Sequence, residues 1–300
     1  MATAVPVLEC VPNVSEGRDR PVIERLAAAV RAVPAVALAD VHADPDHHRS
    51  VFTFLGPPDA VGRAALALAH AALDAVDMRR HQGAHPRIGA LDVCPFVPLA
   101  GMTLEQAAAA ARAFAATLGA ERGLPVYLYG AAATTPARRP LPAVRAGGYE
   151  GLAARLADPA WAPDAGPARL DPRAGAVAVG ARSVLVAYNV WLDSDDLDAA
   201  RAIARLVRES SGGLPALQAM GVRLPSRGCV QVSMNLVDPR RTSLGRAHDA
   251  VAAEAARRGI GVRRAELVGL TPRAALEGRP PAGVGLPDLR PEQYLDTWLA

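Results

Sequence analysis

HQGAHPRIGALDVCPFVP, residues 81–98, is the stretch around which we expect the fold to be organised. Gly83, Pro86 and Gly89 prevent a regular helix in its first half. The second half, residues 88–97, is rich in apolar side chains and predicts a buried strand. A loop of titratable side chains that leads into a buried strand is a favourable place for a functional site.

Two histidines of this stretch, His81 and His85, are candidates for chemistry. Their spacing would place them on one face of a helix, as in a metal-binding pair, but Pro86 disfavours helical geometry at His85. A zinc site also needs a third ligand, and none follows at a typical spacing, so we expect no metal. Spacing alone leaves two interpretations of His85 open, a general acid–base group or a surface or structural histidine.

Composition excludes several classes of protein. The 300 residues are 51% hydrophobic, enough for the core of one large domain or of two small ones. No apolar run of about 18 residues lacks a charge, and the N-terminus carries no secretory signal, so we expect no membrane partner. The net charge is only +3 and aromatic residues are 4%, which disfavours a nucleic-acid partner. Three scattered cysteines, Cys10, Cys94 and Cys229, are typical of a reducing cytoplasm.

The first half of the chain predicts the order strand, helix, strand, strand, helix, strand. We expect the four strands at residues 5–11, 36–41, 50–55 and 88–97. The first helix begins at the capping residue Asp19, and the second runs from residues 56–59 to about Val76. This order is the split βαβ pattern of ferredoxin-like sheets. A capping box at residues 103–106 then begins a further helix, and a strand follows at residues 125–129.

The second half predicts the same order. Residues 131–180 are rich in proline and glycine, and we expect irregular chain there with one short helix near residues 149–156. Strands are then expected at residues 183–192, 217–222, 229–237 and 260–270, with helices after Ser194 and over residues 244–258. The fold class is therefore α+β. We expect two ferredoxin-like βαββαβ subdomains side by side, residues 1–180 and 181–300, with a ligand cleft between them.

Residues 85–96, HPRIGALDVCPF, closely resemble the HPRMGALDVCPF signature of the glutamate formimidoyltransferase (formiminotransferase) family. Further segments agree with the same family: ECVPNVSEG at residues 9–17, PVYLYG at 125–130, WAPD at 161–164, QVSMNL at 231–236 and LVGL at 267–270. The resemblance covers nearly the whole chain. It points to the stand-alone form of the family, so no cyclodeaminase domain is expected after Ala300.

The resemblance implies transfer of the formimino group from N-formimino-L-glutamate to N5 of tetrahydrofolate, in histidine degradation. It also implies that His85 is catalytic, that tetrahydrofolate is the co-substrate, and that the protein is a cytoplasmic homodimer served by a separate cyclodeaminase. A histidine suits this reaction because N5 must lose a proton and the glutamate nitrogen must gain one. Two alternatives stay open, formyl transfer from N-formylglutamate at the same site and a folate-binding protein without activity.

The family's folate-binding segment maps onto residues 166–175. Its ten members are Gly166, Pro167, Ala168, Arg169, Leu170, Asp171, Pro172, Arg173, Ala174 and Gly175. Arg169 and Arg173 are candidates for the carboxylates of the folate tail, with solvated loop arginines as the alternative. Arg49 and Arg87 are candidates for the carboxylates of the substrate, with a structural role as the alternative.

Polar residues near the predicted strand ends complete the candidate site. Asn13 and Glu16 follow the first strand, where sheets often bind ligands, although Asn13 can also serve only the turn backbone. Asp92, in the signature strand, either orients His85 or is a buried, paired carboxylate. Asp40 and His42 are possible supporting groups, because His42 stands at a position that is acidic in relatives. A His42 close to the catalytic histidine would lower the pKa of that histidine.

Overall fold

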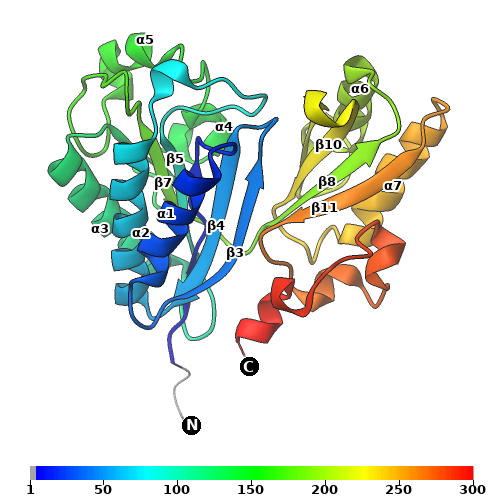
Figure 1. Ribbon diagram of the computed structural model, residues 1–300, viewed down its shortest axis with the longest axis horizontal. Helices are drawn as coiled ribbons and strands as arrows, with labels where there is room; N and C mark the ends of the chain where they lie inside the picture. The colour runs from blue at the N-terminus through cyan, green and yellow to red at the C-terminus, as the bar shows by residue number, and fades with distance from the viewer. Residues whose placement is uncertain (1–4, 300) are drawn as a thin grey trace. The chain divides into compact units, whose positions relative to one another are not determined.

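The computed structural model describes residues 5–299, and the chain divides into two compact units between Arg182 and Ser183. The first unit contains a seven-stranded mixed sheet and the second a four-stranded antiparallel sheet (Figure 1). Helices accompany both sheets, so the expected α+β class is confirmed. Among residues 5–299, none of the helices is both long and apolar enough to cross a membrane.

The first unit is built on one mixed sheet. Its strands are β1 (Leu8–Cys10), β2 (Asn13–Val14), β3 (Ala37–Asp44), β4 (Arg49–Gly56), β5 (Leu91–Pro98), β6 (Val126–Gly130) and β7 (Val177–Ala181). Its α-helices are α1 (Arg20–Arg31), α2 (Pro58–Ala75), α3 (Leu104–Arg122), α4 (Leu141–Val144) and α5 (Leu152–Ala157). The short β1 and β2 both pair with β4 and β5, and β3 pairs with β4. Beyond β5, β7 and then β6 extend the sheet in parallel.

Capping residues that the sequence identifies begin two of these helices. The side chain of Asp19 accepts a hydrogen bond from the backbone nitrogen of Val22 at the start of α1. Thr103 and Gln106 form a reciprocal capping box at the start of α3. Both predicted helix starts are therefore confirmed.

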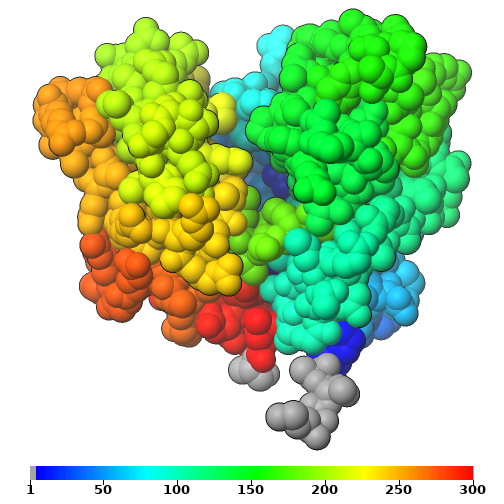
Figure 2. Space-filling model, turned by 180° about the vertical axis from the view of Figure 1, so that it is seen from behind, coloured from blue at the N-terminus to red at the C-terminus, as the bar shows by residue number. Residues whose placement is uncertain are grey.

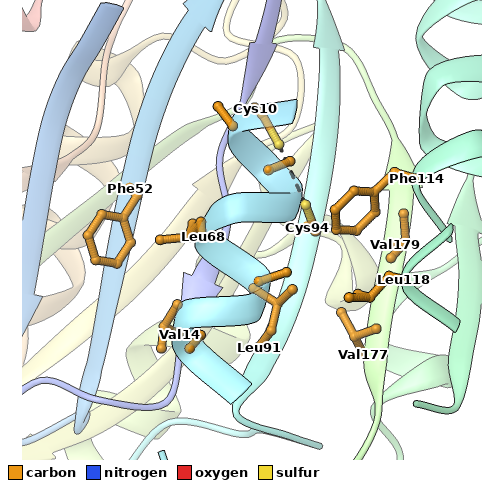
Figure 3. Close-up of a cluster of buried hydrophobic side chains, with 14 of the residues drawn as sticks. Cys10, Val14, Phe52, Leu68, Leu91, Cys94, Phe114, Leu118, Val177 and Val179 are labelled. Carbon is orange, nitrogen blue, oxygen red and sulfur yellow. Dashed lines mark hydrogen bonds between the residues drawn. The ribbon is translucent and has the colours of Figure 1, made fainter. Parts of the chain in front are cut away.

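One face of the first sheet packs against α1, α2 and α3. Figure 3 shows part of this core, including the side chains of Phe52, Leu68 and Phe114. The apolar side chains of this core include Phe52, Phe54, Leu68, Phe96, Phe114 and Val179. Cys10 and Cys94 meet in it, with their sulfur atoms 3.6 Å apart and no exposed surface. Burial raises the pKa of the Cys10 thiol, so this residue is a packing group. The opposite face of the sheet, at Tyr127 and Tyr129, packs against α4 and α5.

The second unit has the order strand, helix, strand, strand, helix, strand. Its elements are β8 (Val186–Leu192), α6 (Leu197–Val207), β9 (Leu217–Leu224), β10 (Cys229–Leu236), α7 (Leu244–Ala256) and β11 (Val262–Val268). All strand pairs are antiparallel, and the strand order is β11-β8-β10-β9. The two helices contribute apolar side chains to one core with the sheet, and short 3-10 turns after β11 add Leu276 and Val284.

The structure corrects the expected elements at three places. Residues 131–180 are mostly irregular, as expected, and α5 lies at the predicted short helix, but this segment also contains α4 and most of β7, which lies between β5 and β6 in the sheet. The strand β7 is short and contains only Val, Ala and Gly, so it lacks the pattern that marks a strand. The strand expected at residues 183–192 begins at Val186, and Asp196 rather than Ser194 caps α6. The strand β3 extends to Asp44, beyond the expected end at residue 41, so His42 lies in the strand and not after it.

Gly89→Ala tests whether the signature loop lies as close to the chain before β7 as the structure shows. A Cβ atom at Gly89 would lie 2.1 Å from the backbone oxygen of Ala176 and 2.7 Å from that of Ala174. Gly89→Ala is therefore expected to lower the free energy of unfolding by about 1–3 kcal/mol, measured by urea denaturation.

Gly62→Ala is the matched control, because a Cβ at this position in α2 meets nothing within 4 Å. Here the substitution is expected to raise the free energy of unfolding by about 0.5–1 kcal/mol, since alanine favours a helix. Equal free energies of unfolding for Gly89→Ala and Gly62→Ala would contradict the close approach at Gly89.

Candidate functional site

Three loops of the first unit interlock to form the candidate site: residues 15–19, residues 45–48 and the signature loop, residues 81–89. Arg18 donates from Nε to the carbonyl of Pro45 at 2.9 Å and from Nη2 to the carbonyl of Gln82 at 3.1 Å. Gly83 allows a further close approach, because a Cβ there would lie 2.2 Å from the backbone oxygen of His47. The side chain of Arg18 and the close approach at Gly83 thus hold the three loops together.

His48 and His81 link the same loops. Their rings stack with centroids 4.3 Å apart, and His48 Nε2 lies 3.3 Å from Glu16 Oε1. His81 accepts a hydrogen bond at Nδ1 from Arg87 Nε at 3.2 Å, so its Nε2 is the donor to the backbone oxygen of His48 at 2.7 Å. Burial lowers the pKa of His81 to about 4. His81 is therefore a neutral, structural histidine.

Arg87 and Glu16, both candidates for ligand binding, have partners within the protein. Arg87 makes a bidentate pair with Glu150, with N–O distances of 2.6 and 2.9 Å. Glu16 accepts from the backbone nitrogens of Arg18 at 2.7 Å and Asp19 at 3.0 Å. Burial favours its neutral form, but the hydrogen bonds from His48 and these amides lower the pKa of Glu16 to about 2. Both side chains hold the loops in place.

Asp92 of β5 is the buried centre of the site, with no exposed surface. Its Oδ2 accepts from Arg49 Nη1 at 2.6 Å and from Arg145 Nη2, and its Oδ1 accepts from the backbone nitrogen of Ile88 at 2.9 Å. Burial opposes ionisation, but Arg145 and Arg49 outweigh it and lower the pKa of Asp92 to about 2. The ionised carboxylate therefore joins β4, the end of α4 and the signature loop.

Arg49 extends this network to β2. Its Nε donates to Asn13 Oδ1 at 2.8 Å, and Asn13 Nδ2 donates to the carbonyl of Val11 at 2.8 Å. Burial lowers the pKa of Arg49 to about 10, while Asp92 opposes this change, so the guanidinium stays charged at neutral pH. Three candidates from the sequence, Asn13, Arg49 and Asp92, thus form one hydrogen-bonded network.

His85 lies half-buried in the signature loop. Its Nδ1 is 2.8 Å from the carbonyl oxygen of Pro86, and because a carbonyl only accepts, Nδ1 carries the proton and Nε2 the lone pair. Burial, reinforced by the charges of Arg49 and Arg145, lowers the pKa of His85 well below 6.5. The ring of His47 lies 5.7 Å away, centroid to centroid. At neutral pH, His85 is therefore an uncharged ring whose Nε2 can accept a proton.

Arg145 and His47 are parts of the site that sequence reasoning missed. Arg145 follows α4 in the proline- and glycine-rich segment and belongs to no motif, so nothing in the sequence marks it. His47 stands in the turn after β3, where the cluster of histidines and aspartates was the available signal. Asp40 and His42 pair with Thr53 and Val51 across β3 and β4, and their supporting roles stay predictions.

The expected folate segment, residues 166–175, approaches the signature loop only at its C-terminal end. Ala174 accepts at its carbonyl from the backbone nitrogen of Ala90 at 2.8 Å. Gly175, at φ 75°, lies so close that a Cβ there would be 2.3 Å from the backbone oxygen of Ile88. The first four residues of the segment are exposed, including Arg169. The preceding chain, residues 131–165, forms a green lobe of the surface in Figure 2.

Arg173, the second arginine of this segment, has a partner on α2. Its Nη2 donates to the backbone oxygen of Asp74 at 2.8 Å, and its own carbonyl accepts from the nitrogen of Met78 at 3.0 Å. The segment also accepts a hydrogen bond from Tyr149 OH at the carbonyl of Pro172, 2.5 Å. These contacts tie its second half to the rest of the unit.

The assembled groups suit proton transfer beside a bound anion. A neutral imidazole, His85, lies near two guanidinium groups and one carboxylate, which leaves an excess of positive charge. Among residues 5–299, no group of three or more His, Cys, Asp and Glu side chains is arranged to hold a metal ion.

Comparisons with known proteins agree over nearly the whole chain. The model described as "Formiminotransferase domain, N-terminal subdomain" matches residues 7–182, and that described as "Formiminotransferase domain" matches residues 187–278. The chain is 43% identical over 270 residues to the glutamate formimidoyltransferase of Streptococcus pyogenes serotype M1, covering 90% of each chain. It is 42% identical to the glutamate formimidoyltransferase of Thermoplasma acidophilum, covering 90% of this chain and 89% of that one. It is also 42% identical to the formimidoyltransferase-cyclodeaminase of Rattus norvegicus, covering 90% of this chain and 51% of that one.

Asp92→Asn tests whether the buried carboxylate holds the site together. The substitution keeps an acceptor for Ile88 but leaves two buried guanidinium groups without their counter-charge. We expect the free energy of unfolding to fall by about 3–5 kcal/mol in urea denaturation.

Asp74→Asn provides the control, because Asp74 pairs with Arg122 at a largely exposed position. Its effect is expected to stay below about 1 kcal/mol. If Asp92→Asn were equally mild, the buried network would not be a major contribution to stability.

Proposed function

Because the chain belongs to the formiminotransferase family, we propose that it transfers the formimino group from N-formimino-L-glutamate to N5 of tetrahydrofolate, with His85 as the general acid–base group. One observation carries the role of His85: its Nδ1 proton is held by the carbonyl of Pro86, so the neutral ring presents Nε2 as a base. The lowered pKa of His85 supports the same role, because the ring is uncharged when the substrate arrives.

The reaction needs one proton to move between two nitrogens. N5 of tetrahydrofolate attacks the formimino carbon, and Nε2 of His85 takes the proton that N5 loses as the new C–N bond forms. The same nitrogen then returns this proton to the glutamate nitrogen, the C–N bond to glutamate breaks, and L-glutamate and 5-formiminotetrahydrofolate leave. A histidine that acts as base and then as acid contributes roughly 10²–10⁴-fold to the rate.

The binding roles of the other candidates follow from their charge. We assign one carboxylate of the substrate to the positively charged network of Arg49 and Asn13, with Arg87 and Glu16 holding the loops beside it. Residues 166–175 take the folate co-substrate, with Arg169 and Arg173 toward the carboxylates of its tail. The contacts of Ala174 and Gly175 with the signature loop support this assignment.

Several larger features remain predictions of the same proposal. These are domains at residues 1–180 and 181–300, ferredoxin-like subdomains, a ligand cleft between them, a homodimer, a cytoplasmic location, and a separate cyclodeaminase for the next step. The order strand, helix, strand, strand, helix, strand supports the ferredoxin-like description in both units.

His85→Ala tests the assigned reaction. Formimino transfer from N-formimino-L-glutamate to tetrahydrofolate is expected to fall by roughly 10²–10⁴-fold, because the variant lacks the proton carrier. The measurement is the steady-state rate for wild type and variant, each with N-formimino-L-glutamate and with N-formyl-L-glutamate.

His70→Ala, at a partly exposed histidine of α2 that pairs with Glu121 of α3, is the control and should keep the wild-type rate. Turnover by the wild type with the formyl donor alone would replace the proposed donor and keep the site. If neither donor reacts but folate binds, the protein is a folate-binding protein and the proposed activity is wrong.

The pH profile tests the protonation state of His85. Its pKa is lowered well below 6.5, so the neutral base is fully present at pH 6.5 and is lost only as the pH falls through this lower pKa. We therefore expect kcat/KM for the donor to lose activity only well below pH 6.5, in a series from about pH 4.5 to about pH 8. Circular dichroism at each pH controls for unfolding. An acid limb at or above pH 6.5 would show that a different group is the base.

A further inference from the structure

We propose that Arg145 binds the α-carboxylate of the formiminoglutamate donor and thereby selects glutamate as the carrier of the formimino group. The inference rests on the proposed function and deepens it. It concerns a residue that no sequence motif marks and whose side chain reaches the buried centre of the site.

The first argument is an imbalance of charge. Asp92 is the carboxylate that both Arg49 and Arg145 contact, so two positive charges share one negative charge. The side chains of these arginines are only 7% and 14% exposed, and that of Asp92 is 0% exposed. An uncompensated charge at such a position is unfavourable unless a partner arrives. An anionic ligand supplies that partner.

The second argument is a donor without an acceptor. Arg145 uses Nη2 for Asp92, while its Nε is buried and has no hydrogen-bond partner among residues 5–299. Buried polar atoms of this kind are rare in native proteins, and each points to a missing partner. A guanidinium that already donates to one carboxylate through one nitrogen can donate to a second carboxylate through the others. Arg145 is thus prepared for an anion in a way that Arg87, paired with Glu150, is not.

The third argument selects the donor over the folate tail. Arg145 is close enough to His85 to contribute to the lowered pKa of that histidine, so the anion it binds lies near the proton-transfer group. In N-formimino-L-glutamate, only one nitrogen and one carbon separate the formimino carbon from the α-carboxylate. In tetrahydrofolate, the whole aminobenzoyl group separates N5 from the glutamate. A carboxylate beside His85 is therefore that of the donor.

The experiment compares two donors with three proteins. The donors are N-formimino-L-glutamate and its α-carboxamide, and the proteins are wild type, Arg145→Gln and Arg145→Lys. For Arg145→Gln, kcat/KM with the carboxylate donor is expected to fall by about 10- to 100-fold, mainly through the KM of the donor. With the carboxamide donor, kcat/KM of Arg145→Gln should change by less than about 3-fold, so the preference for the carboxylate donor disappears. Arg145→Lys should recover part of this preference, since lysine keeps the charge and loses the planar fork.

Arg122→Gln serves as the control, because Arg122 pairs with Asp74 on the helical side of the same unit and has no part in the site. It should keep the wild-type preference between the two donors. Circular dichroism and thermal unfolding establish that each variant is folded. If Arg145→Gln does not fold, the donor preference of Arg145→Lys is compared with that of the wild type instead.

Two outcomes would overturn the inference. An unchanged carboxylate preference in Arg145→Gln would show that Arg145 does not bind this group. A rise in the KM for tetrahydrofolate, with the KM for the donor unchanged, would assign the carboxylate to the folate tail instead.

A calorimetric titration with L-glutamate, the product, separates the role of Arg145 from the proposed function. If the wild type binds L-glutamate and Arg145→Gln does not, Arg145 has its carboxylate contact even if no donor is turned over.

Discussion

A single buried carboxylate, Asp92, is the constraint on which the candidate site depends. Its two oxygens hold the signature loop through the backbone nitrogen of Ile88 and two arginines from separate parts of the first unit. Because the group is fully buried, its charge survives only with these partners, and they in turn are positioned by it. Burial lowers the pKa of His85 and the same pair of arginines lowers it further, so the arrangement that holds the loop also favours the neutral form of the proposed base.

The histidines of the site have different roles because their hydrogen-bond partners differ. His81 has both ring nitrogens engaged within the protein and holds the loops together. His85 has only Nδ1 engaged within the described residues 5–299, by the adjacent carbonyl, and so keeps Nε2 for chemistry. Both rings are uncharged at neutral pH because burial lowers their pKa. The difference between a structural and a reactive histidine is therefore the hydrogen bonding of the second nitrogen.

The sequence predicted the parts of the molecule that depend on local patterns. Proline and glycine positions excluded a helix around His85, capping residues marked the starts of α1 and α3, and the strand expected at residues 50–55 is β4. It failed where the partner is distant along the chain. The strand β7 is stabilised by neighbours on both sides rather than by its own pattern, and Arg145 is recognised only through Asp92, 53 residues earlier. The roles of Arg87 and Glu16 were equally beyond reach, since their partners Glu150 and His48 carry no motif.

The position of β7 also governs when the first unit can form during synthesis. This strand lies between β5 and β6, although it follows both of them along the chain. Until residue 181 has left the ribosome, the nascent sheet has an open gap, and the signature loop lacks the backbone of residues 174–176 against which it packs. Such long-range parallel pairing is intrinsically slow to form and exposes unpaired strand edges meanwhile. The loop that bears the proposed base is thus among the last parts of its unit to become ordered.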